Sequence, residues 1–221
     1  VARKLAHEIK NPLTPIQLSI DSLREKYKNK LKNEGQEFEK YLETINRQVK
    51  DIENLVNEFS NFARMPRPLL KKIDIIKVIN KSLDFIKMTS KNSINLIEKI
   101  NYKIINGDED QLNRVFINLI KNSEESFLDR IEKDPNFKGN IDIEISDNND
   151  YIIIRLTDNG TGISDIKKAM TPYFTTKKTG TGLGLPIVTK IINEHAGNIS
   201  IKNNSNRIGT EIKILLPKYN A

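Results

Sequence analysis

Residues 38–63 read FEKYLETINRQVKDIENLVNEFSNFA, and their apolar positions recur every three or four residues. An unbroken alternation of these two spacings is the pattern of a long amphipathic helix that packs against other helices. The segment therefore predicts a helix with one continuous apolar stripe. The stripe consists of Phe38, Leu42, Ile45, Val49, Ile52, Val56, Phe59 and Ala63.

A similar stripe runs from Leu5 to Tyr27, and a polar break at 33–35 separates it from the second helix. Two amphipathic helices joined by a short polar turn form an antiparallel hairpin. One hairpin cannot enclose such a stripe, so we expect two copies to pair as a four-helix bundle, which predicts a homodimer. A proline-rich segment up to Pro68 ends the second helix, and the first predicted domain therefore covers residues 1–68.

The remaining residues, 69–221, mix helical and strand patterns. Because the strands cluster in sequence with few strand–helix–strand alternations, they favour an α+β domain with helices layered on one mixed sheet. We therefore predict a second domain over 69–221 that is a two-layer α/β sandwich. Its helices are expected at about 75–88, 109–131 and 187–192, and its strands at 94–97, 102–105, 141–145, 152–156, 199–201 and 212–216.

Composition excludes several classes of protein. The 221 residues contain no Cys and two His, which excludes disulfides, thiolate or His-rich metal sites and cysteine nucleophiles. No apolar run approaches the roughly 18 to 20 residues of a membrane span, and the chain does not start with a signal peptide. We therefore expect a cytoplasmic chain without direct membrane contact. The net charge of +7 comes from interspersed charges of either sign, so we do not expect nucleic-acid binding.

The first helix carries the candidate nucleophile. At 100° per residue, His7 points away from the apolar stripe, and Asn11 lies one turn further along nearly the same direction. Neutral imidazole is a nucleophile near pH 7, and the neighbouring Glu8 carboxylate can hold one ring nitrogen protonated while the other attacks. The other histidine, His195, lies near a predicted helix end, and we interpret it as structural.

Two further motifs suit a phosphate-bearing ligand. Asn118 and Asn122 lie one turn apart beside a buried helix face, and an amide oxygen is a suitable ligand for Mg²⁺, although such pairs also occur on ordinary surfaces. Asp158 ends a predicted strand and is followed by Gly160 and Gly162. Its carboxylate can accept a hydrogen bond from an exocyclic amine and the glycines allow close approach, but a simple turn fits the same pattern.

A glycine-rich segment, Gly180-Thr181-Gly182-Leu183-Gly184, opens directly into a helix. Free backbone N–H groups at a helix start bind anions. The segment is not a P-loop, because it lacks the Gly-Lys-Ser/Thr sequence, and it is not a dinucleotide fingerprint, because no strand–helix–strand unit surrounds it.

The stretch His7-Glu8-Ile9-Lys10-Asn11-Pro12-Leu13 resembles the H box of the sensor histidine kinases of two-component systems. Residues 118–122, 158–162, 172–177 and 180–185 resemble the N, G1, F and G2 boxes of that family, in the family's order. The longer strings 1–19 and 49–68 are most similar to the NtrY-type nitrogen-regulation sensors.

The resemblance implies a dimerisation and histidine-phosphotransfer hairpin followed by an ATP-binding domain of the Bergerat fold. It implies that His7 is phosphorylated, that Glu8 acts as its base and that Asn11 positions water for dephosphorylation. Asn122 is the implied Mg²⁺ ligand, and Asp158 the residue that reads the adenine amino group. The remaining ATP-binding residues implied are Asn118, Gly160, Gly162, Phe174, Thr176, Lys177, Gly180, Thr181, Gly182, Leu183, Gly184 and Thr210.

The function implied is a histidine kinase that autophosphorylates His7 from ATP·Mg²⁺ and passes the phosphoryl group to an aspartate of a response regulator. The resemblance to this subfamily also implies an NtrX-like regulator and a full-length parent that is an inner-membrane sensor. Three alternatives stay open at this point. The chain can act chiefly as a phosphatase of its partner, as a non-autophosphorylating ATPase of the wider gyrase, Hsp90 and MutL superfamily, or as a degenerate scaffold.

Overall fold

The structure, a computed structural model, describes residues 2–27, 35–63, 65–88, 90, 92–177, 180–204 and 208–219, with the backbone alone for 2–8, 10 and 61. The chain forms two compact units. One consists of residues 1–66 with 176–183, and the other of 67–175 with 184–221. Within the described residues, no helix combines the length and the apolar character that a membrane span needs.

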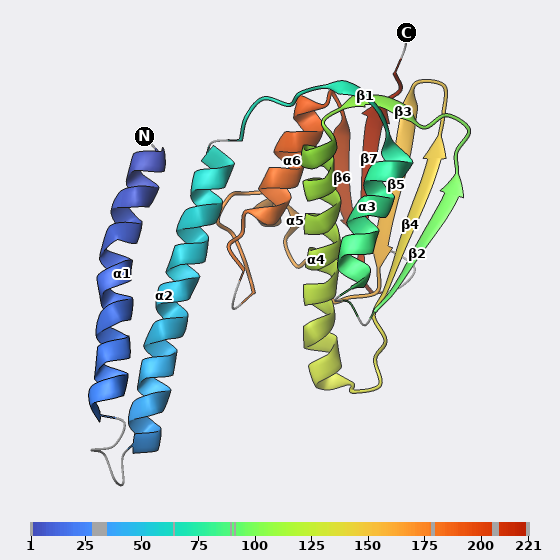
Figure 1. The fold of residues 1–221 in the computed structure, drawn as a ribbon. Coiled ribbons are helices and arrows are strands. Elements are labelled where there is room, and N and C mark those ends of the chain that lie inside the picture. The colour runs from blue at the N-terminus through green and yellow to red at the C-terminus, as the bar shows by residue number, and fades with distance from the viewer. Residues whose placement is uncertain are drawn as a thin grey trace. The chain divides into compact units, whose positions relative to one another are not determined.

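The first unit contains the predicted helical hairpin, α1 (Ala2–Tyr27) followed by α2 (Gly35–Ala63) (Figure 1). Its core is formed by Leu13 and Ile20 of α1 against Leu42 and Val49 of α2, with Phe38 packed at the edge. The buried residues of each helix lie seven positions apart, so one side chain in every two turns faces the other helix. This spacing is the physical origin of the pattern in the sequence.

The hairpin leaves the other half of its apolar stripe uncovered. Five side chains of this half are between 37% and 45% exposed, although they belong to the same periodic series as the core. At 100° per residue they lie on one common side of the hairpin, next to the buried set. We call this set the open stripe: Ile9, Ile16, Leu23, Ile45 and Ile52.

The second unit is built on a five-stranded sheet of order β2-β4-β5-β7-β6 and a two-stranded sheet of β1 and β3. Strand β2 pairs in parallel with β4, whereas the other neighbours are antiparallel, so the predicted mixed sheet is confirmed. The strands are β1 (Lys71–Asp74), β2 (Ser93–Lys99), β3 (Ile104–Gly107), β4 (Asn140–Asp147), β5 (Tyr151–Asp158), β6 (Asn198–Asn203) and β7 (Thr210–Pro217).

Helices α3 (Ile75–Lys87), α4 (Glu109–Lys133) and α6 (Gly184–Glu194) cover one face of this sheet (Figure 1). Alternate isoleucines of β4, such as Ile143, are fully buried beneath them. The opposite face is polar, and Arg155 forms ion pairs there with Glu144 and Glu211. Because one sheet face is apolar and the other is charged, helices pack on a single side and the domain has the predicted two layers.

Two short elements differ from the sequence-based expectation. Strand β1 was not predicted, because it is short and its pairing partner, β3, lies about thirty residues or more further along the chain. The other is the four-residue helix α5 (Ile166–Ala169), which Asp165 caps by accepting from the N–H of Lys168. An element of this length has too few residues for a periodic pattern.

The packing beneath the helices permits a prediction of stability. Phe127 on α4 is fully buried and its ring lies 5.9 Å from that of Phe137. Replacing Phe127 by Ala is expected to lower the free energy of unfolding of this domain by about 3–5 kcal/mol, because a cavity replaces a large ring. Amide hydrogen exchange in β4 and β5 measures this quantity for this domain alone.

The matched control is Phe85→Ala on α3, because Phe85 is 59% exposed. It is expected to change the same free energy by about 0.5 kcal/mol or less. Equal losses in the two variants would contradict the assignment of Phe127 to the core.

Candidate functional site

The start of α4 is fixed by an acidic cap. Asp108 Oδ1 accepts hydrogen bonds from the backbone N–H groups of Asp110 and Gln111, each at 3.1 Å. Asp108 Oδ2 accepts from the N–H of Leu69 at 2.9 Å, which ties the start of the second unit to this helix. Burial acts to raise the pKa of Asp108, but these backbone donors outweigh it and hold that pKa below its ordinary value. The cap sets the position of α4, which carries Asn118 and Asn122.

His195 supports the same corner of the domain. The side chain is buried, its Nε2 accepts from the backbone N–H of Asp108 at 2.9 Å, and its Nδ1 lies 2.8 Å from the carbonyl oxygen of Ile191. These partners require a neutral ring that carries its proton on Nδ1. Burial lowers the pKa of His195 below its ordinary value, although the hydrogen bond to the Ile191 carbonyl acts to raise it. The structural interpretation of His195 is therefore confirmed.

A buried carboxylate lies at the end of β5. Asp158 is 3% exposed. Its Oδ1 accepts from the backbone N–H groups of Gly160 at 2.9 Å and Thr210 at 3.1 Å. Its Oδ2 accepts from the Ser123 hydroxyl at 3.2 Å. Three donors from three segments thus compensate the cost of burying this charge, and they hold its acceptor oxygens in one orientation.

The backbone comes close to this carboxylate where glycines allow it. A Cβ at Gly160 would lie 1.8 Å from Ser126 Oγ, and one at Gly209 would lie 2.1 Å from the Asp158 carbonyl oxygen. Gly209 also has a φ of +138°. The packing around Asp158 therefore requires glycine at these two positions, whereas the role of Gly160 in the approach of a ligand stays a prediction.

The residue after Asp158 holds the turn in place. Asn159 Oδ1 accepts from the Asn140 backbone N–H at 2.8 Å, and Asn159 Nδ2 donates to the Lys138 carbonyl oxygen at 3.0 Å. Arg130 of α4 donates to the Asn159 carbonyl oxygen at 2.8 Å. Sequence reasoning did not single out Asn159 or Arg130, because the segments that they join are far apart in the chain.

The two predicted amides lie on α4 beside the start of α6. Within the described part of the chain, the Nδ2 atom of Asn118 is buried without a hydrogen-bond partner. A Cβ at Gly184 would lie 3.5 Å from Asn122 Nδ2, in ordinary van der Waals contact, so α6 begins directly beside this amide. An orphaned amide beside a second amide fits a polar ligand. No trio of His, Asp and Glu side chains suited to a metal occurs among the residues that the structure describes. A cation here would therefore depend on amide oxygen and on the ligand's own oxygens.

The other predicted residues fall into separate groups. The side chains of His7 and Glu8 lie outside the described residues, although their backbone belongs to α1, and Asn11 is exposed on α1. Phe174 is half-buried, and Gly162 has a φ of +78°.

The last group of predicted residues belongs to residues 176–183, which form part of the hairpin's compact unit. There the Thr181 hydroxyl donates to the Glu58 carboxylate. Gly182 has a φ of +68°, and Leu183 is fully buried. The remaining members of this group are Thr176, Lys177 and Gly180.

Ser123 was missed by sequence reasoning, although a signal was present. Leu119, Ser123 and Phe127 occupy the buried face of α4 at intervals of four residues. A single hydroxyl in an otherwise apolar helix face needs a buried partner. Asp158 is that partner, and the pattern of α4 alone could have indicated that such a group exists.

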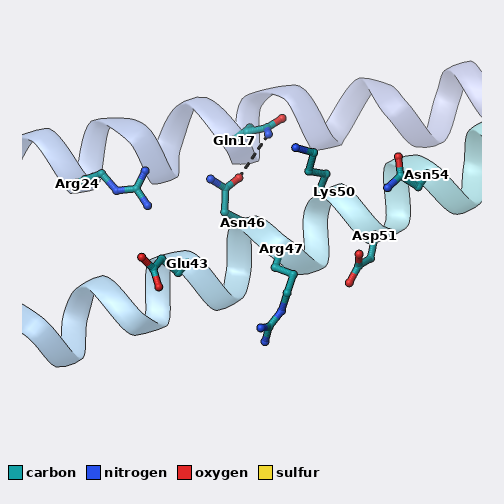
Figure 2. Close-up of a pocket in the computed structure, with 8 residues that line it drawn as sticks. All are labelled: Gln17, Arg24, Glu43, Asn46, Arg47, Lys50, Asp51 and Asn54. Carbon is teal, nitrogen blue, oxygen red and sulfur yellow. Dashed lines mark hydrogen bonds between the residues drawn. The ribbon is translucent and has the colours of Figure 1, made fainter. Parts of the chain in front are cut away.

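The hairpin also carries a polar groove between α1 and α2, which Figure 2 shows. Gln17 Nε2 donates to Asn46 Oδ1 at 3.4 Å within it. At 100° per residue the groove lies on the side of the hairpin away from the open stripe. Charged side chains of either sign line it, and no predicted site residue does so. The lining residues are Gln17, Arg24, Glu43, Asn46, Arg47, Lys50, Asp51 and Asn54.

Two family models match the chain. The His Kinase A (phospho-acceptor) domain matches residues 1–68. The histidine kinase-, DNA gyrase B- and HSP90-like ATPase model matches residues 107–220, which is more than half of the chain. The first match covers the hairpin, and the second covers α4 and the cluster around Asp158.

Curated relatives match over nearly the whole chain. A putative sensor histidine kinase NtrY-like from Rickettsia bellii (strain RML369-C) is 41% identical over 206 residues, which cover 92% of this chain and 33% of that protein. The nitrogen regulation protein NtrY from Azorhizobium caulinodans is 34% identical over 98% of this chain and 28% of its own length. The chain thus spans about a third of the length of these relatives.

Among solved structures, the histidine kinase ThkA in complex with the response regulator protein TrrA is similar. The TM-score is 0.67 at 23% identity, over 98% of this chain and 60% of that one. At this identity the likeness concerns the fold, and it agrees with the predicted order of a helical hairpin followed by a two-layer sandwich.

Proposed function

We propose that this chain, which belongs to the sensor histidine kinases and has an NtrY-like sequence, transfers the γ-phosphoryl group of ATP to His7. From there the group passes to an aspartate of a response regulator. The observation that carries the proposal is the buried Asp158 carboxylate, held by Gly160, Thr210 and Ser123 inside the region matched by the ATPase model. The phospho-acceptor match over the hairpin does not favour an ATPase that leaves itself unmodified.

The base of the nucleotide would form a hydrogen bond with Asp158. A buried carboxylate accepts hydrogen bonds and has none to donate, so it favours the exocyclic amine of adenine over a carbonyl at the same place. Asn118 offers a buried amide N–H that has no partner within the described residues, and this group suits a phosphate or sugar oxygen. The backbone N–H groups from Gly180 to Gly184, at the start of α6, would receive phosphate oxygens.

The phosphates require charge neutralisation. Asn122 would hold Mg²⁺ through its amide oxygen, and the bound cation would neutralise charge on the transferring group. Lys177 is the candidate cation of the chain for the same task. Most of the catalysis of phosphoryl transfer comes from such positioning and neutralisation.

His7 would then act as the nucleophile. One imidazole nitrogen forms a bond to the γ-phosphorus while the bond from that phosphorus to the β,γ-bridging oxygen breaks, and ADP leaves. The Glu8 carboxylate would hold the proton of the other ring nitrogen. Asn11, one turn further along α1, is placed to orient a water molecule when the phosphoryl group is removed.

Labelling with ATP tests this function. The purified chain is incubated with γ-labelled ATP and Mg²⁺, and we expect label on the protein that is released by acid and survives base, as a phosphohistidine requires. Adding a receiver domain is expected to move the label to that domain. Absence of protein label, or label that resists acid, would overturn the proposal.

We further propose that two copies of the chain pair through the open stripe as a four-helix bundle. Five apolar side chains more than a third exposed on one side of a hairpin form a surface that a second hairpin can cover. Replacing Ile16 by Glu places two like charges inside such a bundle. We expect the dimer dissociation constant to rise by about 100-fold or more, as measured by sedimentation equilibrium.

Leu18→Glu is the matched control, because it introduces the same charge on the same helix two residues away. Leu18 is 63% exposed and lies outside the open stripe. Its substitution is expected to leave the dissociation constant within a factor of about two, as for surface changes in general. Equal weakening by the two variants would place the interface elsewhere.

The remaining proposals concern the setting of the chain. We place its domain boundary between residues 68 and 69. We place the chain in the cytoplasm, where ATP and response regulators occur, as part of a longer inner-membrane sensor whose regulator is NtrX-like. The curated relatives, which are about three times as long as the matched region, support the view that the sensing part is a separate region.

A further inference from the structure

The orientation of the Asp158 carboxylate depends on different donors at its two oxygens. Oδ1 receives two backbone N–H groups, from Gly160 at 2.9 Å and Thr210 at 3.1 Å. These donors occupy the two acceptor directions of that oxygen. Oδ2 receives the side-chain hydroxyl of Ser123 at 3.2 Å. A ligand base that hydrogen-bonds to this carboxylate therefore meets Oδ2, the oxygen that Ser123 contacts.

The Ser123 hydroxyl is itself held in place. Its Oγ lies 3.3 Å from the carbonyl oxygen of Leu119, one helical turn earlier, and the residue is 3% exposed. A hydroxyl has a single proton, which it shares between Leu119 and Asp158. The helix thereby fixes Oγ on one side of Oδ2. Because the backbone donors hold Oδ1 and the Ser123 hydroxyl holds Oδ2, the plane of the carboxylate is fixed as well.

We propose that Ser123 is a positioning residue of the nucleotide site: its hydroxyl turns Asp158 so that the second acceptor direction of Oδ2 meets the exocyclic amine of the base. This rests on the proposed function, and it adds a determinant of base selectivity that lies directly beside the proposed metal ligand, Asn122. One turn of α4 then carries both the residue that orients Asp158 and the phosphate-side residue.

The chemical consequence is a preference between two bases that differ in the group at C6 and in the proton on N1. Adenine presents an amine to Oδ2, whereas hypoxanthine presents a carbonyl oxygen, which cannot donate. A carboxylate that Ser123 holds in place binds the adenine amine through a hydrogen bond and repels the hypoxanthine carbonyl. Without the hydroxyl, the carboxylate can tilt about its anchored Oδ1. The hydrogen bond to the amine then weakens, and the repulsion of the carbonyl is partly relieved.

The test measures the dissociation constants of ADP and inosine diphosphate by titration calorimetry on the full chain and on its Ser123→Ala variant. We expect Ser123→Ala to raise the dissociation constant of ADP by about 3- to 15-fold, the usual range for the loss of a single intramolecular hydrogen bond. The dissociation constant of inosine diphosphate is expected to change by less than about two-fold, so the preference for ADP falls. Equal changes for the two ligands, or an unchanged preference, would overturn the assignment.

Ser82→Ala is the matched control. Ser82 on α3 is equally buried, and its hydroxyl likewise contacts a carbonyl one turn earlier, that of Val78, and a side-chain oxygen, that of Asn113. It is expected to leave the preference for ADP unchanged, although it removes a comparable hydroxyl from a buried helix face. A fall in preference in this control equal to that in Ser123→Ala would also overturn the assignment.

Failure of the proposed function has a different signature. If the unmodified chain binds neither diphosphate, or binds the two equally, the assignment of Asp158 to the base fails before Ser123 is considered. If the unmodified chain prefers ADP and Ser123→Ala keeps that preference, the site stands and Ser123 has no positioning role.

Discussion

Replacing His7 by Ala is expected to abolish acid-labile phosphorylation of the chain by ATP while leaving nucleotide binding intact. The chain contains two histidines, and the other one, His195, is buried and uses both ring nitrogens in hydrogen bonds. His195 therefore cannot replace His7 as a nucleophile without leaving its place in the fold. The measurement is γ-labelled ATP incorporation, beside a titration of ADP on the same protein.

His7→Gln serves as the companion variant, because it keeps a polar side chain of similar length without a nucleophilic imidazole. It is expected to lose the label as completely as His7→Ala. Acid-labile label that persists in either variant would show that His7 is not the acceptor. Normal ADP affinity in the two variants would confirm that the loss concerns the acceptor and not the nucleotide site.

Replacing Asp158 by Asn is expected to weaken ATP binding by about 100-fold or more, which corresponds to about 2.7 kcal/mol. The amide oxygen would take the place of Oδ1, because Gly160 and Thr210 present N–H donors there. The NH₂ group would then replace Oδ2 and face the amine of the base, donor against donor. A buried donor without an acceptor adds its own desolvation cost to the lost hydrogen bond.

Asp150→Asn is the control for loss of one negative charge, since Asp150 lies in the exposed turn between β4 and β5. It is expected to bind ATP with the affinity of the unmodified chain. ATP affinity that survives in Asp158→Asn would remove Asp158 from the base site.

Mixing His7→Ala chains with Asp158→Asn chains distinguishes phosphorylation within one subunit from phosphorylation between subunits. Label on the Asp158→Asn chain requires transfer from the partner subunit, because that chain binds ATP weakly itself.

Much of the fold could be read from periodicity. The hairpin followed from the spacing of Leu42, Val49 and Val56, since an amphipathic helix depends only on residues within a few turns of one another. The helix predicted from about residue 109 agrees with α4, whose start Asp108 caps by accepting from the N–H groups two and three positions later. Such features are local, so a single sequence contains all of their determinants.

The division of the apolar stripe required the structure. Ile45 and Val49 belong to the same series in the sequence, yet Val49 is buried in the hairpin and Ile45 is 45% exposed. Which member faces α1 depends on how the two helices rotate against each other. Side chains of the two helices decide this together, and the pattern of one helix does not contain that information.

The candidate site divides in the same way. The sequence by itself determined which residue types occur in order along the chain: a histidine beside an acid, a pair of amides, an aspartate before glycines, and a glycine-rich helix start. Only the tertiary structure decided what else holds Asp158 besides the neighbouring Gly160, because the other two donors come from positions 35 residues earlier and 52 residues later. Likewise, Asp108 and His195 meet across 87 residues. The physical reason is that motif order is a property of the chain, whereas satisfaction of a buried charge depends on which distant segments the core brings together.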